Sequence, residues 1–338
     1  MQMMKKNKIY IIAEAGVNHN GSLNYAKQLI IKAKKCGADA IKFQIFNKYE
    51  QISNFALTAP YQNRNTKKKN MLKMAEEYDF EWENHIVLKK LCDRIGIEYM
   101  ASCFDKKSVD FYIKILKAKI MKIASSEIDN LRLLKYINLK CKNVILSTGM
   151  SNIDEISIAV KCLKKVKNLY LMQCTSLYPT KLEEANLNVI KLFIQRFNLI
   201  TGFSDHTLTS TSALVSVGCG ARIIEKHFTL SNSLKGPDHK MSLNPKKFKK
   251  FVSQIRNAEK TLGFLTKAPT KEEKKIIKYS RRGLFAAVNI HRGEKLSHRH
   301  ISYKRPSSFL PISFEKKIIG KKVKRFISKG LPIKKNIF

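Results

Sequence analysis

The sequence predicts a (β/α)8 barrel followed by a small β-rich domain. Eight short apolar runs, rich in Ile, Val, Phe or Tyr, alternate with helical patterns from residue 8 to about residue 261, an alternation typical of a parallel sheet covered by helices. Eight units within about 250 residues fit a closed barrel better than an open sheet. An open doubly wound sheet would normally carry GxGxxG after its first strand, and this chain has Asn18-His19-Asn20-Gly21 there instead.

The expected barrel strands are the apolar runs at 8–15, 40–46, 98–104, 119–125, 143–148, 169–174, 199–204 and 222–228. Helical periodicity lies between them, for example at 24–35, 154–164 and 187–197, and glycines mark the turns. The longest gap, 47–97, is expected to hold a polar loop and then helices that end near Arg94.

Three parts follow from these patterns: a barrel domain over residues 1–265, a linker over 266–278 and a small domain over 279–338. The linker is expected because this stretch is lysine-rich and poor in large apolar residues. The last part has short strand-like pieces with turn signals at Arg292-Gly293 and Lys329-Gly330. A core this small is marginal, so we expect the domain to dock on a partner.

The formal net charge is +39, from 65 Lys and Arg against 26 Asp and Glu. Such an excess is typical of nucleic-acid-binding proteins, but here it is mostly lysine spread along the whole chain, without a basic arm or a helix-turn-helix signature. We interpret the charge as solvated lysine faces that attract an anionic substrate. Because the charge is spread in this way, we do not expect a nucleic acid as partner. A membrane is not expected either, because no run of about 18 uncharged apolar residues occurs.

The seven cysteines are scattered and form no CxxC pair, which is typical of reduced thiols in the cytoplasm. The N-terminus has basic residues before an apolar stretch, as secretion signals do. That stretch is short, β-branched and interrupted by Glu14, so it predicts a first buried strand instead.

Reactive side chains gather where the predicted strands end, and in a barrel all these ends lie at one rim. In chain order they are Glu14; Lys42 and Gln44; Ser102; Lys122, Ser125 and Glu127; Ser147 and Thr148; Thr175, Ser176 and Tyr178; Ser204, Asp205 and His206; and Glu225 and His227. A lone strand-end serine is most often a turn former and a lone lysine is usually solvated. Lys42 and Lys122, however, lie inside apolar runs, where an unpaired charge is costly. Two such lysines at one rim predict an anionic ligand, for example one that carries phosphate and carboxylate.

His206 and His227 end adjacent predicted strands. Each alone is more often a hydrogen-bonded core histidine than a ligand. Together, with Glu14 and Asp238 available, they could form a divalent-metal site with open positions for water or substrate. The spacing is a weak signal, since no local HxxxH-type motif supports it.

The sequence resembles the sialic acid synthase family over nearly its whole length. The segments that carry the resemblance are IIAEAGVNHNGS (11–22), ADAIKFQIF (38–46), KIASSEIDNLRLL (122–134), VILSTGMS (144–151), CTSLYP (174–179), GFSDHT (202–207), IEKHFTL (224–230) and GPDHKMSL (236–243). It continues into RRGLFAAVNIHRGEKLS (281–297) and YKRP (303–306). This tail resembles the small antifreeze-like (SAF) domain of the family.

The resemblance implies a function and a set of roles. His206 and His227 would bind a divalent metal, Mn²⁺ ahead of Mg²⁺ or Co²⁺, with Asp238 holding a metal-bound water. Phosphoenolpyruvate would be held by Lys42, Ser102, Lys122, Ser125, Ser147, Ser176 and Ser204. The amino-sugar would face Glu14, Gln44, Glu127, Tyr178 and Asp238. Arg305 would come from the other subunit of a domain-swapped homodimer. Glu14, Asp238 and Lys122 are the expected catalytic groups, although the sequence does not assign which residue moves which proton.

Two departures from the family pattern concern the substrates. Cys103 stands where the family usually has proline, and Ser307-Ser308-Phe309-Leu310 replaces a glycine-containing Gly-x-Gly-Ile. The favoured acceptor is N-acetylmannosamine, which would give N-acetylneuraminate. The alternative is 2,4-diacetamido-2,4,6-trideoxy-mannose, which would give legionaminate, and a pseudaminate synthase is a third choice.

Three further readings stand beside a sialic-acid-type synthase. A sugar-phosphate condensing synthase would need extra basic groups for a second phosphate. A nucleic-acid-binding protein would show salt-sensitive binding to DNA or RNA. A relative that only binds would have lost catalysis, which the presence of His206, His227 and Lys122 argues against.

Overall fold

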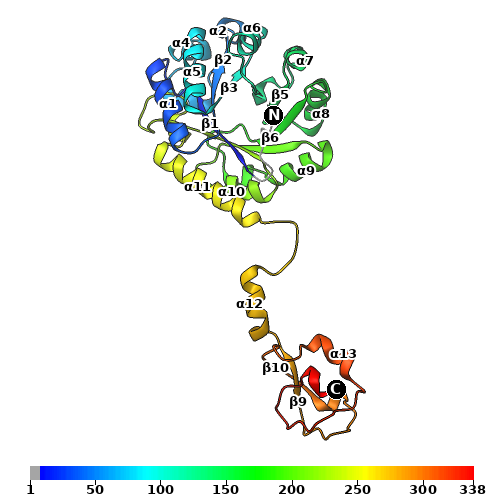
Figure 1. The fold of residues 1–338 in the computed structure, drawn as a ribbon. Coiled ribbons are helices and arrows are strands. Elements are labelled where there is room, and N and C mark those ends of the chain that lie inside the picture. The colour runs from blue at the N-terminus through cyan, green and yellow to red at the C-terminus, as the bar shows by residue number, and fades with distance from the viewer. Residues whose placement is uncertain (1–7) are drawn as a thin grey trace. The chain divides into compact units, whose positions relative to one another are not determined.

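The computed structural model describes residues 8–338 and divides into two compact units, Met1–Gly263 and Phe264–Phe338. In the first unit eight parallel strands close into a barrel in chain order (Figure 1). The strands are β1 Tyr10–Gly16, β2 Ala40–Ile45, β3 Glu98–Cys103, β4 Met121–Ile123, β5 Asn143–Ser147, β6 Asn168–Cys174, β7 Ile200–Asp205 and β8 Ile223–His227. The predicted (β/α)8 barrel is confirmed, with each strand inside or within one residue of its predicted range.

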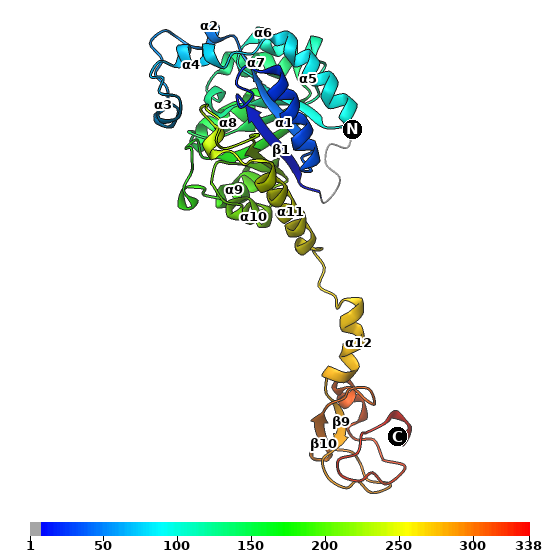
Figure 2. The ribbon, with the colours of Figure 1, turned by 90° about the vertical axis from the view of Figure 1, so that its left-hand side faces the viewer.

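Helices follow every strand and cover the outside of the barrel (Figures 1 and 2). They are α1 Leu23–Lys35, α2 Lys48–Gln51, α3 Pro60–Thr66, α4 Met71–Glu77, α5 Trp82–Ile95, α6 Lys106–Asp110, α7 Leu131–Lys140, α8 Ile153–Cys162, α9 Asn188–Phe197, α10 Thr211–Gly218 and α11 Pro245–Leu262. A π-helical turn, Phe111–Ile115, continues α6. Within residues 8–338 no helix is long and apolar enough to cross a membrane.

Local sequence signals explain where these helices start. The side chain of Asn152 accepts hydrogen bonds from the first turn of α8, and the Glu155 carboxylate accepts one from the Asn152 backbone N–H, which forms a capping box. The side chain of Asn244 caps α11 by accepting from the Lys247 backbone N–H, and Pro245 occupies the first turn, where the missing N–H costs nothing. The long gap between β2 and β3 holds α2 to α5. The last of these helices ends at Ile95, close to the predicted end near Arg94.

Side chains on the barrel strands alternate between two environments. Those that face the interior begin with an apolar layer made by Ile12, Ala40, Met100, Ile120, Ile145, Met172 and Ile223. Those that face outward, such as Ile11, Ile41, Tyr99 and Leu146, pack against the helices in the main core. Because strands have a period of two, the residue two positions after each member of the interior layer also faces inward, at the carboxyl end of its strand. This rule places the site residues described below.

Two histidines lie unprotonated in an aromatic part of the main core. The ring of His19 packs 4.3 Å from that of Phe80, and Phe80 packs 5.1 Å from His85. The Tyr99 hydroxyl lies 2.8 Å from Nδ1 of His85. Burial lowers the pKa of His19 to about 4 and that of His85 to about 3. Both therefore stay neutral in the fold at pH values where an unfolded histidine takes up a proton.

We expect these histidines to make the barrel less stable in acid. The folded pKa lies below the unfolded value of about 6.5, so their contribution is complete above pH 6.5 and falls with the pH, by about 1.4 kcal/mol per pH unit for each group. Buried Glu14 and Asp238 have raised pKa values and act in the opposite sense. The measurement is therefore a difference: the melting temperature of wild type minus that of His85→Gln, from pH 7.5 to 4.5. It should shrink as the pH falls, and a pH-independent difference would contradict the expectation.

The second unit contains α12 Lys271–Ser280, the antiparallel strands β9 Gly283–Ala286 and β10 Ile301–Lys304, and α13 Glu315–Ile318. Isolated bridges such as Ile290↔Ile327 and Lys295↔Lys322 join the remaining extended pieces. They surround a core formed by Leu284, Ala286, Ile290, Leu296, Leu310, Ile318, Val323, Ile327, Ile333 and Ile337. Its regular sheet is thus smaller than the sequence suggested, because short strands interrupted by turns pair at single points.

Helix α12 lies where the sequence analysis expects a linker, residues 266–278. Thr270 and Glu273 form a capping box at its start, a signal that outweighs the shortage of apolar residues. The Ser307 backbone N–H donates to the Lys278 carbonyl, 3.1 Å away, which ties the helix to the second unit. The boundary between the units follows Gly263, whereas the sequence analysis put it after residue 265.

Candidate active site

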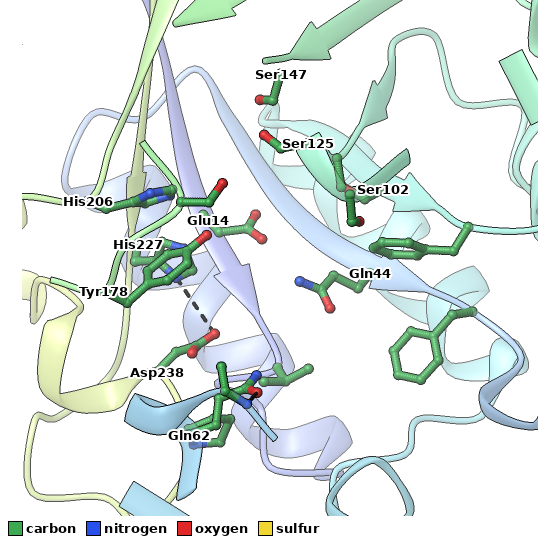
Figure 3. A pocket seen from close by; sticks show the side chains of 18 of the residues that line it. Glu14, Gln44, Gln62, Ser102, Ser125, Ser147, Tyr178, His206, His227 and Asp238 are labelled. Carbon is green, nitrogen blue, oxygen red and sulfur yellow. Dashed lines mark hydrogen bonds and ion pairs between the residues drawn. The ribbon is translucent and has the colours of Figure 1, made fainter. Parts of the chain in front are cut away.

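A cavity of about 470 Å³ opens at the carboxyl ends of the barrel strands (Figure 3). Most of the residues predicted from the strand ends line it: Glu14, Lys42, Gln44, Ser102, Lys122, Ser125, Ser147, Ser176, Tyr178, Ser204, His206 and His227, with Asp238 from the loop after β8. They come from all eight strands or from the turns that follow them. The structure therefore gathers in one place residues that are up to 224 positions apart in the chain.

The period of two explains why these side chains point inward. Glu14 follows Ile12 by two positions, as Lys122 follows Ile120 and Ser147 follows Ile145. The strand register then sets the neighbours: Glu14 lies beside Lys42 and His227, and Ser102 beside Lys122. The apolar layer closes the barrel beneath them, so polar groups face the cavity from a dry floor.

Glu225 joins the two lysines at this floor. Its Oε1 lies 3.2 Å from Nζ of Lys122 and accepts a hydrogen bond from the Ser204 hydroxyl at 3.0 Å. Its Oε2 lies 3.7 Å from Nζ of Lys42. Lys42 in turn lies 3.0 Å from Oε2 of Glu14 and donates to the Ser102 hydroxyl at 3.2 Å. The sequence analysis noted Glu225 at a strand end but gave it no role.

Burial and these contacts shift the ionisation of all four groups. Burial raises the pKa of Glu14 to about 7, against the opposing effect of Lys42. Burial would also raise the pKa of Glu225, but Lys122 and Lys42 outweigh it and hold it at about 2. The pKa of Lys122 is lowered by burial and by Lys42, whereas that of Lys42 is raised, because two carboxylates outweigh its burial. The floor therefore holds one firm carboxylate at Glu225, two lysine amino groups and a carboxyl at Glu14 whose pKa is about 7.

Hydroxyl groups form a second part of the floor around Gly149. The Gly149 backbone N–H donates to the Ser125 hydroxyl at 2.9 Å. A Cβ on Gly149 would lie 2.2 Å from the Ser176 hydroxyl oxygen and 3.0 Å from that of Ser125. The Ser147 hydroxyl is buried without a hydrogen-bond partner. A buried hydroxyl without a partner is costly unless a ligand accepts a hydrogen bond from it. This cluster is therefore suited to an anion with several oxygen atoms.

Replacement of Gly149 by alanine tests this cluster. The new methyl group would push Ser176 out of place and remove a donor from the anion site. We expect this to raise the KM for the predicted anionic substrate, phosphoenolpyruvate, by about tenfold to 100-fold, as for a lost hydrogen bond to a charged group. Steady-state kinetics would measure it. Gly218→Ala is the matched control, because nothing lies within 4 Å of a Cβ there. An unchanged KM in Gly149→Ala would show that the cluster does not hold the anion.

The two predicted metal-binding histidines lie side by side in the cavity wall. Their ring centroids are 5.5 Å apart. Nδ1 of His206 lies 2.7 Å from the carbonyl oxygen of Thr175, which can only accept, so Nδ1 carries a proton and, in the neutral ring, Nε2 keeps its lone pair. Burial would lower the pKa of His206, but Cys174 and the Thr175 carbonyl outweigh it and raise that pKa. Nδ1 of His227 is buried without a hydrogen-bond partner and lies 3.9 Å from Oδ2 of Asp238 (Figure 3). The ring of Tyr178 packs 4.1 Å from that of His206.

These groups could supply some, but not all, of the ligands of a divalent metal. Among residues 8–338 no group of three or more His, Cys, Asp or Glu side chains has the arrangement of a complete metal site. Two imidazoles with a free lone pair and an unpartnered buried atom at each of His227 Nδ1 and Asp238 Oδ1 suit an ion that takes its remaining ligands from water or substrate. The binding of a metal here, and its identity, stay predictions.

A buried ion pair fixes the backbone on both sides of His206. Nζ of Lys226 lies 2.9 Å from Oδ2 of Asp205 and also donates to the carbonyl of Thr207. Oδ1 of Asp205 accepts from the Thr207 backbone N–H at 2.9 Å. The side chains of Lys226 and Asp205 are almost fully buried, so this arrangement limits the positions that His206 can take.

Three of the groups predicted to face a sugar lie around Gly16. A Cβ on Gly16 would lie 3.3 Å from Oε1 of Glu14, 3.7 Å from Nε2 of Gln44 and 3.8 Å from Oδ2 of Asp238. These three polar groups therefore converge on one point, and the lack of a side chain at Gly16 leaves it open. Burial raises the pKa of Asp238 to about 6. Tyr61 and Gln62 of α3 also line the cavity and were not predicted.

Two predicted site residues do not line this cavity. The Glu127 carboxylate accepts hydrogen bonds from the Ser126 hydroxyl at 3.2 Å and from the Asn130 side chain at 2.9 Å, next to the start of α7. These local hydrogen bonds keep the Glu127 carboxylate away from the cavity. Arg305 belongs to the second unit, and its role at the site stays a prediction.

Comparison with known proteins identifies the family. The model of the NeuB family matches residues 29–267. The chain belongs to the NeuB family. It is 40% identical to the N,N'-diacetyllegionaminic acid synthase of Campylobacter jejuni over 93% of this chain and 95% of that protein. It is 32% identical to the human N-acetylneuraminate-9-phosphate synthase over 76% of this chain and 72% of that protein.

A solved structure of a sialic acid synthetase has the same fold. The N-acetylneuraminic acid synthetase of Leptospira borgpetersenii serovar Hardjo-bovis superposes with a TM-score of 0.72 at 33% identity, covering 80% of this chain and 90% of that one. The resemblance to sialic acid synthases found in the sequence is therefore confirmed. The relatives differ in the sugar acid that their names specify, so membership of the family leaves the acceptor open.

Proposed function

We propose that this chain is a sialic-acid-type synthase that condenses phosphoenolpyruvate with an N-acetylated amino-hexose and releases phosphate. The observation that carries the proposal is the cavity floor, where two buried lysines and a set of serine hydroxyls adjoin three sugar-facing polar groups and a histidine pair. Phosphoenolpyruvate carries a phosphate and a carboxylate, and this floor offers positive charge and donors for both. A binding-only role would not require this combination beside a carboxyl that titrates near neutrality.

The residues support the reaction as follows. Lys42 and Lys122 bind the anion, and the hydroxyls of Ser102, Ser125, Ser147 and Ser176 donate to its oxygen atoms. The Ser204 hydroxyl donates to Glu225 and would have to turn from it to donate to the anion as well. The methylene carbon of phosphoenolpyruvate forms a bond to the aldehyde carbon of the open-chain sugar. Water adds to the enol carbon, and the bond from that carbon to the phosphate oxygen breaks. Phosphate leaves with the electron pair of that bond.

Proton transfers fall to carboxyl groups in this proposal. Glu14, with a pKa of about 7, can give a proton to the developing alkoxide or take one from water. Asp238 lies at the convergence point of Glu14 and Gln44, where it can orient the sugar or hold a water. A divalent ion held by His206 and His227 would supply Lewis-acid chemistry at the aldehyde.

N-acetylmannosamine, giving N-acetylneuraminate, is one acceptor within this proposal, and 2,4-diacetamido-2,4,6-trideoxy-mannose, giving legionaminate, is the other. The second is favoured by the 40% identity to the Campylobacter jejuni N,N'-diacetyllegionaminic acid synthase. A domain-swapped homodimer, in which a second copy of the chain supplies Arg305 from an antifreeze-like domain, belongs to the same proposal.

Phosphate release from phosphoenolpyruvate with Mn²⁺ tests the proposal. The panel of acceptors contains N-acetylmannosamine, the diacetamido sugar and arabinose 5-phosphate. Release that depends on an amino-sugar supports the synthase and names its acceptor. Release only with arabinose 5-phosphate would move the chain to the sugar-phosphate synthases, and no release from folded, metal-loaded protein would contradict the proposal.

A further inference from the structure

One side of the cavity is apolar, and the segment between β2 and β3 forms most of it. Figure 2 shows this segment, α2 to α4, projecting from one side of the barrel. The apolar side chains that line the cavity here are Phe46, Ile52, Ala59, Met71, Met74, Ala75 and Phe104. We call them the apolar wall. The polar lining residues from the same segment are the uncharged Gln51, Tyr61, Gln62 and Tyr78.

No charged side chain from residues 46–78 lines the cavity, although this segment contains many. Several of its charges are held in ion pairs instead. Lys48 pairs with Asp79, Lys107 of α6 pairs with Glu50, and Nζ of Lys68 lies 3.4 Å from Glu77. In a chain with 65 Lys and Arg, a wall without any cation is a distinctive feature of this part of the cavity.

The apolar wall is packed rather than loose. Ile52 and Ala75 belong to a small core with Leu72, against which Phe46 and Met71 pack. The rings of Phe46 and Phe104 meet edge to face at 6.2 Å between centroids. Met74 is 6% exposed. These side chains carry no hydrogen-bond donor, and their packing holds the apolar surface in place.

The chemistry of the wall limits which part of an acceptor it can receive. The aldehyde must lie near the phosphoenolpyruvate floor, so the far end of the sugar, at C6, extends away from that floor. A hydroxyl buried against apolar side chains loses its hydrogen bonds to water, and a phosphate loses more. A methyl group gains from the same burial.

We propose that the apolar wall is the subsite for C6 of the acceptor and selects a 6-deoxy sugar over one with a 6-hydroxyl or 6-phosphate. The inference rests on the proposed function, since it concerns the acceptor of the same reaction. It assigns Met71, Met74 and Phe104 as specificity-determining residues. It also distinguishes this chain from a synthase that acts on a 6-phosphorylated sugar, for which a cation at C6 would be expected.

Three acceptors that differ only in the substituent at C6 test this inference. N-acetylmannosamine and 2-acetamido-2,6-dideoxy-mannose differ only by the 6-hydroxyl, and N-acetylmannosamine 6-phosphate adds the charge. We expect kcat/KM of the wild type to be at least about tenfold higher for the 6-deoxy sugar than for N-acetylmannosamine, the range found for small groups in apolar pockets. The 6-phosphate should be the poorest of the three.

Variants test whether the wall causes this preference. Met74→Gln should reduce the ratio of the two kcat/KM values about tenfold, whereas Met74→Leu, which stays apolar, should keep it. Leu72→Gln is the structural control: Leu72 lies on the same helix and is buried, but it does not line the cavity. It should lower both values together and leave the ratio unchanged. Met71→Gln, at a half-buried position, repeats the test if Met74→Gln fails to fold.

The outcomes are separable. Wild-type preference for N-acetylmannosamine or its 6-phosphate would overturn the inference while leaving the proposed synthase intact. A preference for the 6-deoxy sugar that survives both glutamine variants would show that other residues cause it, and would also overturn the inference. Absence of phosphate release with every amino-sugar would contradict the proposed function itself.

Discussion

Lys122→Met is expected to lower kcat/KM for phosphoenolpyruvate by about 100-fold to 1,000-fold. Lys122 is buried, lies 3.2 Å from Glu225 and faces the cavity from β4. In this dry site its positive charge stabilises an anion far more than it would in water, and loss of one such group typically has an effect of this size. Steady-state phosphate release at saturating acceptor measures it.

The fold should survive this change, because Glu225 keeps Lys42 and the Ser204 hydroxyl as partners. Lys119→Met is a matched control: Lys119 lies just before the same strand, and its side chain is 61% exposed. It should retain wild-type kinetics. Near-normal kcat/KM in a folded Lys122→Met protein would remove Lys122 from the proposed anion site.

His227→Ala is expected to abolish divalent-metal-dependent turnover. His227 and His206 are the two imidazoles of the cavity, and Nδ1 of His227 has no hydrogen-bond partner in the fold. Changes to residues that merely orient metal ligands reduce metal affinity by about tenfold to 100-fold, so loss of a ligand should cost at least that much. Electron paramagnetic resonance of free Mn²⁺ gives the affinity of the metal-free protein, and phosphate release against Mn²⁺ concentration gives the activity.

The barrel should tolerate removal of this side chain, which lines the cavity and is not part of the packed core. His298→Ala serves as the control, because the His298 side chain is exposed on the second unit. It should bind Mn²⁺ as the wild type does. A His227→Ala protein with full activity and unchanged Mn²⁺ affinity would contradict the metal assignment.

Sequence patterns predicted most of the fold because each strand carries its own signal. The run IIAEAG in β1 and the run MKI in β4 are short, apolar and bounded by polar turns, and eight such runs fill one barrel. The same patterns missed α12, where a capping box at Thr270 starts a helix in a stretch that looks like a linker. Local capping there outweighed composition.

The candidate site was also largely predictable, since strand-end residues of a barrel meet at one rim. Two kinds of feature were not. Glu127 lies within the predicted rim but turns to Ser126 and Asn130, a choice made by local hydrogen bonds. Met71 and Met74 of the apolar wall lie in a segment far from any strand end, where an apolar residue gives no sign of whether it faces a core or a cavity.

By itself the sequence determined the barrel, the family and the rim of lysines, serines and histidines, because periodicity and local motifs carry that information along the chain. Only the tertiary structure decided that Glu225 joins Lys42 and Lys122, that His206 keeps Nε2 free, and that Met74 faces the cavity. These are relations between side chains from separate strands and loops. They depend on strand register and on the packing of the segment between β2 and β3, which the order of residues alone does not specify.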